Sequence, residues 1–152
     1  MSMLMPYKMN EYAKVSPPMR ATACSAAWDL HADTRQLTGE DYYRLEYGEI
    51  DDIPLGVQFE LLPDYAGFLL LRSKWRRQLN LANGVGLIDE DYRGQLYAPI
   101  ECKSPQGFCI SHNMRIAQFV VMYAPTASIE LVRKEVLNDT ERGHGGFGHT
   151  GV

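Results

Sequence analysis

The sequence predicts an all-β domain, a jelly-roll-like barrel or sandwich of short strands. Short apolar or alternating segments recur along the chain between turns that contain glycine or proline. No long segment repeats its apolar residues with the 3.6-residue period of an amphipathic helix. With 152 residues, 45% of them hydrophobic and 22% charged, the chain has the length and composition of one soluble globular domain.

The N-terminal half contains four predicted features. Residues 7–15 are a weak strand candidate that ends at the Ser-Pro-Pro turn of residues 16–18. Residues 36–44 are polar, so we expect a loop there. Residues 50–61 alternate apolar and polar side chains around a Pro-Leu-Gly turn, which predicts strand, turn and strand. The apolar run of residues 65–71 lies between turn signals and predicts a fully buried strand.

The C-terminal half repeats the strand pattern and then changes composition. Strands are predicted over residues 94–102, 107–111, 116–123 and 128–136. Beyond Leu137 apolar side chains nearly vanish and glycine dominates, so residues 1–137 are predicted to form the folded domain and residues 138–152 a flexible arm. Such an end is commonly a passive terminus, but Arg142 and Phe147 among glycines suit a clamp that orders on a ligand.

The stretch from Asn83 to Gly94 is predicted to form a β-hairpin with backbone amides near its start and carboxylates at its far end. Three consecutive acids, residues 89–91, would by themselves be typical of a solvated turn. Asp89, however, directly follows the apolar pair Leu87 and Ile88. A carboxylate at the end of an apolar strand is better placed to face a ligand, and we therefore single out Asp89 as a functional residue.

Charge and composition argue against several classes of function. The net charge of -4 disfavours binding to nucleic acid, because no basic excess is present to displace counterions. One local basic cluster is compatible with a small anionic ligand; its members are Arg72, Lys74, Arg76 and Arg77. The three cysteines lack CxxC spacing and predict neither a disulfide framework nor a zinc site. The first residues hold no apolar run long enough for a signal peptide or a membrane span, so we expect a cytoplasmic protein that is not bound to a membrane.

Two further polar positions have competing interpretations. Asp29 follows a run of small side chains and stands between Trp28 and Leu30. It is either a strand-end aspartate that caps a turn, which the residues alone favour, or an acid near a metal. Ser73 is predicted to be the N-cap of a short helical turn that reaches Gln78, and a helix start with Ser and Arg is also suited to phosphate.

Five segments, taken together, resemble the motifs of the trimeric dUTPases. Residues 86–94, with the sequence Gly-Leu-Ile-Asp-Glu-Asp-Tyr-Arg-Gly, are similar to the third motif of that family. Residues 142–151 match the fifth motif at every fixed position. Residues 115–118, Arg-Ile-Ala-Gln, match the fourth motif. The resemblance extends from residue 26 to residue 151, with the motifs in the family's order.

The first and second motifs depart from the family pattern. Residues 26–30, Ala-Ala-Trp-Asp-Leu, resemble the first motif, Ala-Gly-Tyr-Asp-Leu, with mild changes. Residues 71–75 stand where Pro-Arg-Ser-Gly-Leu belongs, and only Arg72 and Ser73 are kept. Lys74 takes the place of a glycine. Either the backbone still approaches the phosphates and Lys74 adds charge, or substrate affinity is reduced.

The resemblance implies a homotrimeric enzyme with active sites between subunits, which hydrolyses dUTP to dUMP and pyrophosphate. This reaction keeps uracil out of DNA and supplies dUMP for thymidylate synthesis. Asp89 would activate the water that attacks the α-phosphorus, Mg²⁺ would bind the phosphates, and Asp29 would hold the metal through water. The implied substrate contacts are Arg72, Ser73, Lys74, Asn83, Gly86, Leu87, Ile88, Tyr92, Tyr97, Gln118, Arg142, Phe147 and Gly148.

Within these contacts the resemblance assigns Tyr92 to the deoxyribose, where its ring would exclude a 2′-hydroxyl, and Phe147 to a position over the uracil. The alternative function is a catalytically weak dUTP-binding protein of the same fold that regulates a partner. Loss of the second-motif glycine is the one feature that favours it, whereas retention of Asp89 and Tyr92 favours the enzyme. A dCTP deaminase of the same fold would need a different catalytic acid.

Overall fold

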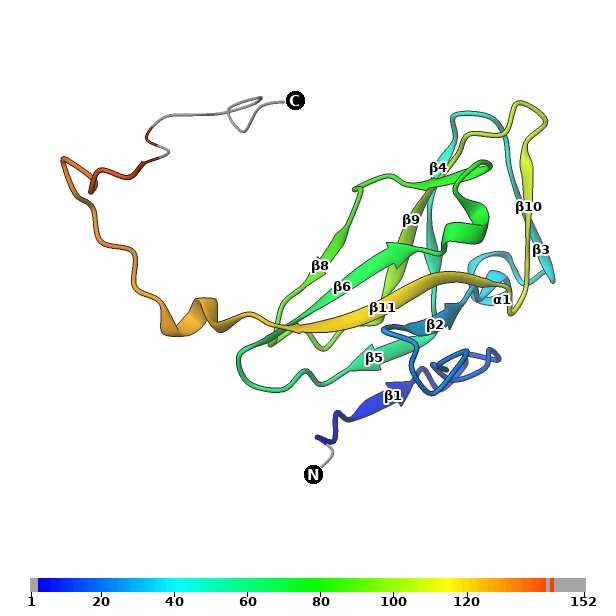
Figure 1. Ribbon diagram of the computed structural model, residues 1–152. Helices are drawn as coiled ribbons and strands as arrows, with labels where there is room; N and C mark the ends of the chain where they lie inside the picture. Colours follow the sequence, from blue (N-terminus) through cyan, green and yellow to red (C-terminus); the bar gives the residue numbers. More distant parts are fainter. Residues whose placement is uncertain (1–2, 142, 144–152) are drawn as a thin grey trace.

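Antiparallel strands make up nearly all the regular structure of the computed structural model, which describes residues 3–141 and residue 143 (Figure 1). The strands are β1 (Tyr7–Met9), β2 (Trp28–His31), β3 (Tyr42–Leu45), β4 (Ile50–Pro54), β5 (Val57–Phe59), β6 (Tyr65–Leu71), β7 (Leu79–Leu81), β8 (Gly86–Ile88), β9 (Tyr97–Cys102), β10 (Phe108–Ser111) and β11 (Arg115–Tyr123). The short helical elements are α1 (Thr34–Thr38) and the 3-10 turns η1 (Ser73–Trp75) and η2 (Pro125–Ser128).

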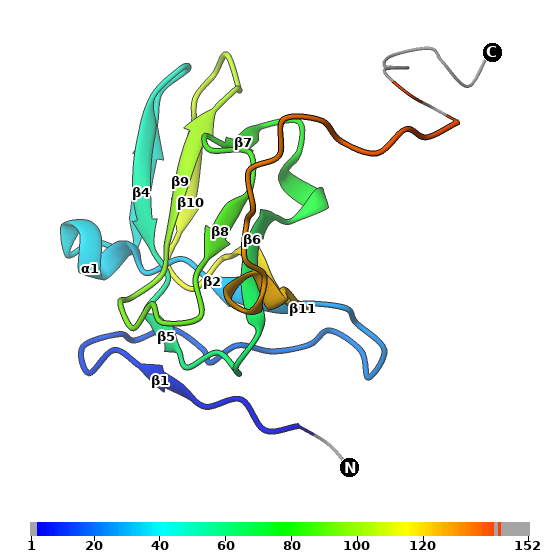
Figure 2. The ribbon, with the colours of Figure 1, turned by 90° about the vertical axis from the view of Figure 1, so that its left-hand side faces the viewer.

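The strands are arranged in sheets around one apolar core. The largest sheet has the order β2-β11-β6-β8, and a three-stranded sheet has the order β4-β9-β7. The pairs β1-β5 and β10-β3 complete the barrel, and every described pairing is antiparallel. Figure 2 shows β6 and β8 facing β4 and β9. Leu69, Ile53, Ile100 and Phe119 come from both layers and are completely or almost completely buried. The predicted all-β, jelly-roll-like class is confirmed.

Most predicted strands are present. The strand, turn and strand over residues 50–61 are β4 and β5, and the remaining confirmed predictions are β6, β9, β10 and β11. The weak candidate over residues 7–15 is a strand only in β1, whose three residues pair with β5.

The loop predicted over residues 36–44 is wrong. Helix α1 occupies the start of this segment, and the side chain of Asp33 caps it by accepting a hydrogen bond from the amide of Gln36 at 3.2 Å. Gly39 ends the helix in the left-handed conformation, with φ of 83°. Strand β3 then begins at Tyr42 and pairs with β10. A five-residue helix is too short to show a helical period, which is why the sequence pattern did not indicate it.

The strand predicted over residues 128–136 is also wrong. η2 ends at Ser128, and the chain beyond it continues without a strand partner in the described residues. Its apolar side chains are exposed, and Leu131 reaches 94% of full exposure. The alternating pattern is present, but the segment pairs with no strand among the described residues.

Strand β6 is not fully buried as predicted. Gly67 and Leu69 face the core, and Gly67 passes so close to Phe119 that a Cβ would lie 2.3 Å from the ring. Phe68 and Leu70 point to the other side of the sheet and are only partly buried. The second face of β6 therefore carries apolar side chains that the described residues of this chain cover only in part.

The hairpin predicted within residues 83–94 and the N-cap predicted at Ser73 are both corrected. β8 forms its hydrogen bonds with β6, and the turn after it closes when the amide of Tyr92 donates to the carbonyl of Asp89 at 3.1 Å. Arg72 occupies the N-cap position of η1, without a side-chain hydrogen bond to the turn. The local sequence thus identified the turn after β8. The strand with which β8 pairs depended on residues far away in the chain.

Candidate functional site

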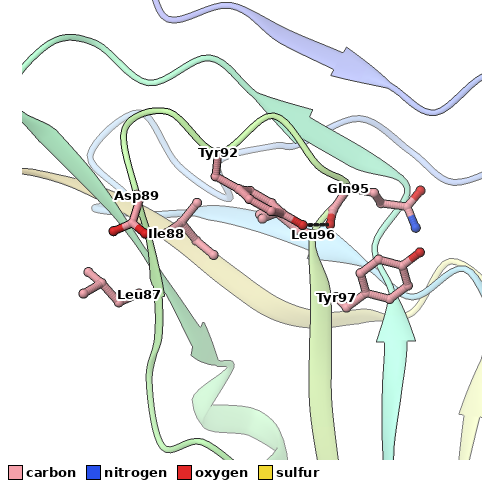
Figure 3. A pocket seen from close by; sticks show the side chains of 7 residues that line it. All are labelled: Leu87, Ile88, Asp89, Tyr92, Gln95, Leu96 and Tyr97. Carbon is pink, nitrogen blue, oxygen red and sulfur yellow. Dashed lines mark hydrogen bonds between the residues drawn. The ribbon is translucent and has the colours of Figure 1, made fainter.

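Asp89 stands at the mouth of a hollow of about 220 Å³ at the end of β8 (Figure 3). The hollow is lined by Leu87, Ile88, Asp89, Tyr92, Gln95, Leu96 and Tyr97. The side chain of Asp89 is exposed and forms neither a hydrogen bond nor an ion pair with any residue that the structure describes. Glu90 differs, because its carboxylate accepts a hydrogen bond from the amide of Asp64 at 2.8 Å. Asp89 is therefore free to act on a ligand, whereas Glu90 holds a neighbouring loop.

The ring of Tyr92 is fixed beside this hollow. Its hydroxyl donates a hydrogen bond to the carbonyl of Gln95 at 2.9 Å, drawn as a dashed line in Figure 3. Gly94 lies directly beneath the ring, since a Cβ at this position would come within 2.3 Å of the Tyr92 hydroxyl. The absence of a side chain at Gly94 thus allows the turn to close and sets the orientation of Tyr92.

The start of β8 carries Asn83 and Gly86 on a turn. The amide of Gly84 donates to the carbonyl of Leu81 at 2.8 Å, and Gly84 has a φ of 71°, which favours glycine. A Cβ on Gly86 would lie 3.1 Å from Leu69 and 3.6 Å from the side-chain nitrogen of Asn83. Among the described residues β8 is the last strand of its sheet and pairs only with β6, so its other edge offers backbone donors and acceptors that no described strand pairs.

A second hollow, of about 390 Å³, lies over β2, β11 and the end of β6. Its lining residues include Ala27, Asp29, Arg72, Ser73, Lys74 and Gln118. Asp29 is only 6% exposed and receives two arginines. Arg72 Nε lies 2.7 Å from its Oδ1, and Arg115 Nη1 lies 3.1 Å from its Oδ2. The residues alone had favoured a turn cap at Asp29, and this interpretation is wrong. The Asp29 carboxylate instead pairs with Arg72, which lines the second hollow, and with Arg115.

The charges of this hollow suit an anion. Asp29 is the one carboxylate in its lining, and both its oxygens are engaged by arginines, while Lys74 adds a further cation. Gln118 donates from Nε2 to the carbonyl of Leu71 at 3.3 Å, which places its amide beside Arg72. His31 lies buried behind Arg115, and its burial, followed by the charge of Arg115, lowers the pKa of His31 below its usual value. The excess positive charge thus comes from Arg and Lys.

The described residues form no direct protein metal site, so a magnesium ion here would have to be held through water and substrate phosphates. Within residues 3–141 and 143 no group of three or more His, Cys, Asp or Glu side chains is placed to ligate a metal. Mg²⁺ commonly retains several waters and binds through substrate phosphates and one or two carboxylates. Asp29 is the carboxylate in this hollow's lining that could hold such an ion through water.

The structure places the two hollows far apart within one chain. Ile88 is opposite Gly67 in the β8-β6 register, so Asp89 lies near Ala66 at the start of β6. Arg72 immediately follows the other end of β6. Six residues of extended strand separate these ends by about 20 Å. The chain therefore brings Asp89 together with Tyr92 and Tyr97, and Arg72 together with Asp29 and Gln118, but it does not bring the two groups together.

Sequence analysis did not assign roles to Arg115 and Gln95. Their positions could have indicated a role in the site, since Arg115 begins the fourth motif and Gln95 directly follows the third. Gln95 supplies the carbonyl that holds Tyr92, and Arg115 shares Asp29 with Arg72. Arg142, Phe147 and Gly148, predicted to bind substrate, lie outside the described residues. In the described part of the chain, no helix has the length and apolar character needed to cross a membrane.

Comparison with known proteins identifies similar chains. The family model described as dUTPase matches residues 13–151. A deoxyuridine 5'-triphosphate nucleotidohydrolase of Thermoanaerobacter sp. (strain X514) is 34% identical over 157 residues, covering 100% of both chains. A protein of the same name from Francisella tularensis subsp. holarctica is 38% identical and covers 89% of each chain.

Solved structures of low identity share the fold. The dUTPase of Staphylococcus bacteriophage 80alpha, as a G164S mutant with dUpNHpp, has a TM-score of 0.81 and 22% identity, covering 99% of this chain and 100% of its own. The dUTPase from Streptococcus mutans has a TM-score of 0.67 and 24% identity, covering 84% of this chain and 98% of its own. At these identities the likeness shows the shared β fold.

Proposed function

Because this chain belongs to the dUTPase family, we propose that it is a dUTP diphosphatase, which hydrolyses dUTP to dUMP and pyrophosphate. The observation that carries the proposal is the unpaired carboxylate of Asp89 beside Tyr92 at the end of β8. Glu90 and Asp29 bind an amide or a cation of their own chain, and the exposed Asp91 does not line the hollow. Asp89 has no such partner among the described residues.

In the proposed reaction Asp89 accepts a proton from water. The water oxygen forms a bond with the α-phosphorus as the bond from phosphorus to the bridging oxygen breaks, and pyrophosphate leaves. A general base of this kind contributes roughly 10²–10⁴-fold. Arg72, Ser73 and Gln118 orient the phosphates and offset their charge. Bound Mg²⁺ would supply further charge neutralisation on the phosphates.

The free edge of β8 is suited to uracil. Uracil offers an acceptor, an N–H donor and an acceptor in a row, and an extended edge strand alternates N–H and C=O groups that complement such a row. Cytosine lacks the N3 donor, and the methyl group of thymine would need space beside the strand. Asn83 and Gly86 stand at the start of this edge, and Leu87 and Ile88 continue it. We assign base selection to this edge, with Tyr97 on the facing side of the hollow.

We propose that the complete site forms between subunits of a homotrimer. The separation of about 20 Å along β6 prevents Asp89 and Arg72 of one chain from acting on one triphosphate. An apolar outer face of the large sheet supports association between copies, since Leu87 is 61% and Met122 is 53% exposed. The exposed residues 129–137 extend from the same sheet and are available to pair with another copy.

The C-terminal residues 138–152 are proposed to act as an arm that closes the site above the domain of residues 1–137. Truncation after Glu141 is expected to lower kcat/KM for dUTP by at least about 100-fold, because Arg142 and Phe147 supply phosphate and base contacts. The melting temperature should stay within about 2 °C, since the removed residues contain little apolar surface to bury. Calorimetry and initial rates measure the two effects. Unchanged activity would make the arm a passive terminus.

Gly94 gives a test of sugar selection. Gly94→Ala should move the Tyr92 ring, because the new Cβ would lie 2.3 Å from its hydroxyl, whereas the backbone at this position is not in the left-handed region. The preference for dUTP over UTP, expressed as the ratio of kcat/KM values, should fall about tenfold. Tyr92→Phe is the control, since it removes the bond to Gln95 but keeps the ring. An unchanged ratio in Gly94→Ala would remove Tyr92 from this role.

The proposed activity is tested by pyrophosphate release from dUTP set against dTTP, dCTP and UTP, with Mg²⁺ present. We expect release from dUTP to exceed that from each other nucleotide by at least about 100-fold. Binding of dUTP without cleavage would instead indicate the regulatory alternative. The comparisons do not favour that alternative, since the curated relatives are named as nucleotidohydrolases.

A further inference from the structure

Lys74 lines the second hollow, which we call the cationic hollow because Arg72 and Lys74 both line it. It belongs to the turn η1, which directly follows β6 and Arg72. Its ammonium lies over the ring of Trp75, 4.7 Å from the ring centroid. This is a cation–π arrangement, and at an exposed position it holds a cation only weakly.

Trp75 is fixed by two contacts. Its indole Nε1 donates a hydrogen bond to the carbonyl of Arg115 at 2.9 Å. Its ring meets the ring of Phe108 edge-on, with centroids 5.4 Å apart and an interplanar angle of 71°. Arg72 Nη1 also donates to the Arg115 carbonyl, at 3.4 Å. The indole is therefore a fixed platform, joined to the same backbone atom as one of the arginines that line the hollow.

The cations around the hollow differ in how far they are already neutralised. Arg72 and Arg115 share the carboxylate of Asp29. Lys74 makes no ion pair with any acid that the structure describes. Among the lining cations, Lys74 can therefore bind a polyphosphate with the smallest loss of existing interactions. Only its weak contact with the indole of Trp75 must break.

We infer that Lys74 and Trp75 form a polyphosphate-binding device in which the ammonium rests on the indole and transfers to the phosphates beyond the α-phosphate when a triphosphate binds. The inference rests on the proposed function for the identity of the substrate and assigns it a further specificity-determining residue. The residue that replaces the second-motif glycine then adds charge and makes affinity depend on the number of phosphates. A nucleoside monophosphate, which lacks those phosphates, gains nothing from Lys74.

Binding of inorganic tripolyphosphate, measured by calorimetry in the presence of a chelator, tests the inference on the full chain. Lys74→Met should weaken tripolyphosphate binding about tenfold, the loss expected for one exposed charge-assisted contact. Lys74→Arg should restore binding to within about threefold, because the positive charge is kept. Arg77→Met is the matched control, since it removes an equal charge from the same basic segment at a residue that does not line the hollow. Equal losses in Lys74→Met and Arg77→Met would overturn the inference.

The fluorescence of Trp75 provides a second measurement, and a loss of positive charge elsewhere on the surface should not alter it. In a Trp28→Phe background Trp75 is the only tryptophan, so its fluorescence reports whether the ammonium stays over its ring. Tripolyphosphate should change this fluorescence in the background variant and leave it unchanged when Lys74→Met is added. The same change in both proteins would contradict the transfer of Lys74.

Turnover separates this inference from the proposed function. Lys74→Met should raise KM for dUTP about tenfold, leave kcat within about twofold and leave inhibition by dUMP unaffected. Tripolyphosphate binding that depends on Lys74 in a protein that never cleaves dUTP would defeat the proposed function and leave the inference standing. Rapid dUTP cleavage with no effect of Lys74→Met on KM or on tripolyphosphate binding would support the proposed function and overturn the inference about Lys74.

Discussion

Asp89→Asn is expected to lower kcat for dUTP by about 10²–10⁴-fold while KM stays within about threefold. The carboxamide has the size of the carboxylate but cannot accept the proton of the attacking water. Stability should be unchanged, because the Asp89 side chain is exposed and contacts no described residue through a hydrogen bond or ion pair. Steady-state pyrophosphate release measures kcat and KM, and calorimetric binding of the imido analogue dUpNHpp measures whether nucleotide affinity is kept.

The acidic run supplies its own controls. Asp91→Asn changes another exposed acid two residues away and should leave kcat within about twofold. Glu90→Gln should weaken the contact with the Asp64 amide, whose bond is 2.8 Å long, and therefore lower stability by about 1 kcal/mol without a comparable loss of kcat. Undiminished turnover in Asp89→Asn, or an equal loss in Asp91→Asn, would exclude Asp89 as the general base.

Mixing two inactive variants is expected to restore activity. Asp89→Asn removes the base from one end of β6, and Arg72→Gln removes a phosphate contact at the other end. If each site takes Asp89 from one copy and Arg72 from another, a 1:1 mixture of randomly assembled trimers contains about one quarter intact sites. Refolding or coexpressing the two chains should therefore return activity to about a quarter of the unmodified level, from near zero for either variant alone.

The control mixture replaces Arg72→Gln with the double variant Asp89→Asn, Arg72→Gln. No copy in that mixture carries an intact carboxylate, so activity should stay near zero. Chains of different mass allow native mass spectrometry to show that mixed oligomers have formed. Mixed oligomers without recovered activity would mean that each site is built from a single chain and would contradict the proposed assembly.

Several features of the site could be predicted from short stretches of sequence. Leu87 and Ile88 before Asp89 indicated an acid at the end of an apolar strand, and Asp89 directly follows β8, which ends at Ile88. Arg72 and Ser73 after an apolar run indicated a phosphate-binding turn, and both line the cationic hollow. Local pattern was enough to place these residues, because the strand and the residue after it are neighbours in the chain. The roles of Asp89, Arg72 and Ser73 toward a substrate stay predictions.

Other features depended on contacts that local pattern does not encode. The hairpin predicted after Asn83 failed because β8 pairs with β6, and the strand predicted over residues 128–136 failed because the segment pairs with no described strand. Helix α1 was missed since five residues carry too little periodicity. For the two strand predictions the outcome is decided by what lies across from the segment in space.

The sequence by itself determined the all-β class, the family motifs and the chemistry available at Asp89, Tyr92 and Arg72, because side-chain type and spacing along a strand are local properties. Only the tertiary structure decided which of these groups meet. Asp29 joins arginines from the ends of two other strands, since β2 and β6 both flank β11. The register of β8 on β6 holds Asp89 about 20 Å from Arg72, because extended backbone sets a fixed rise per residue.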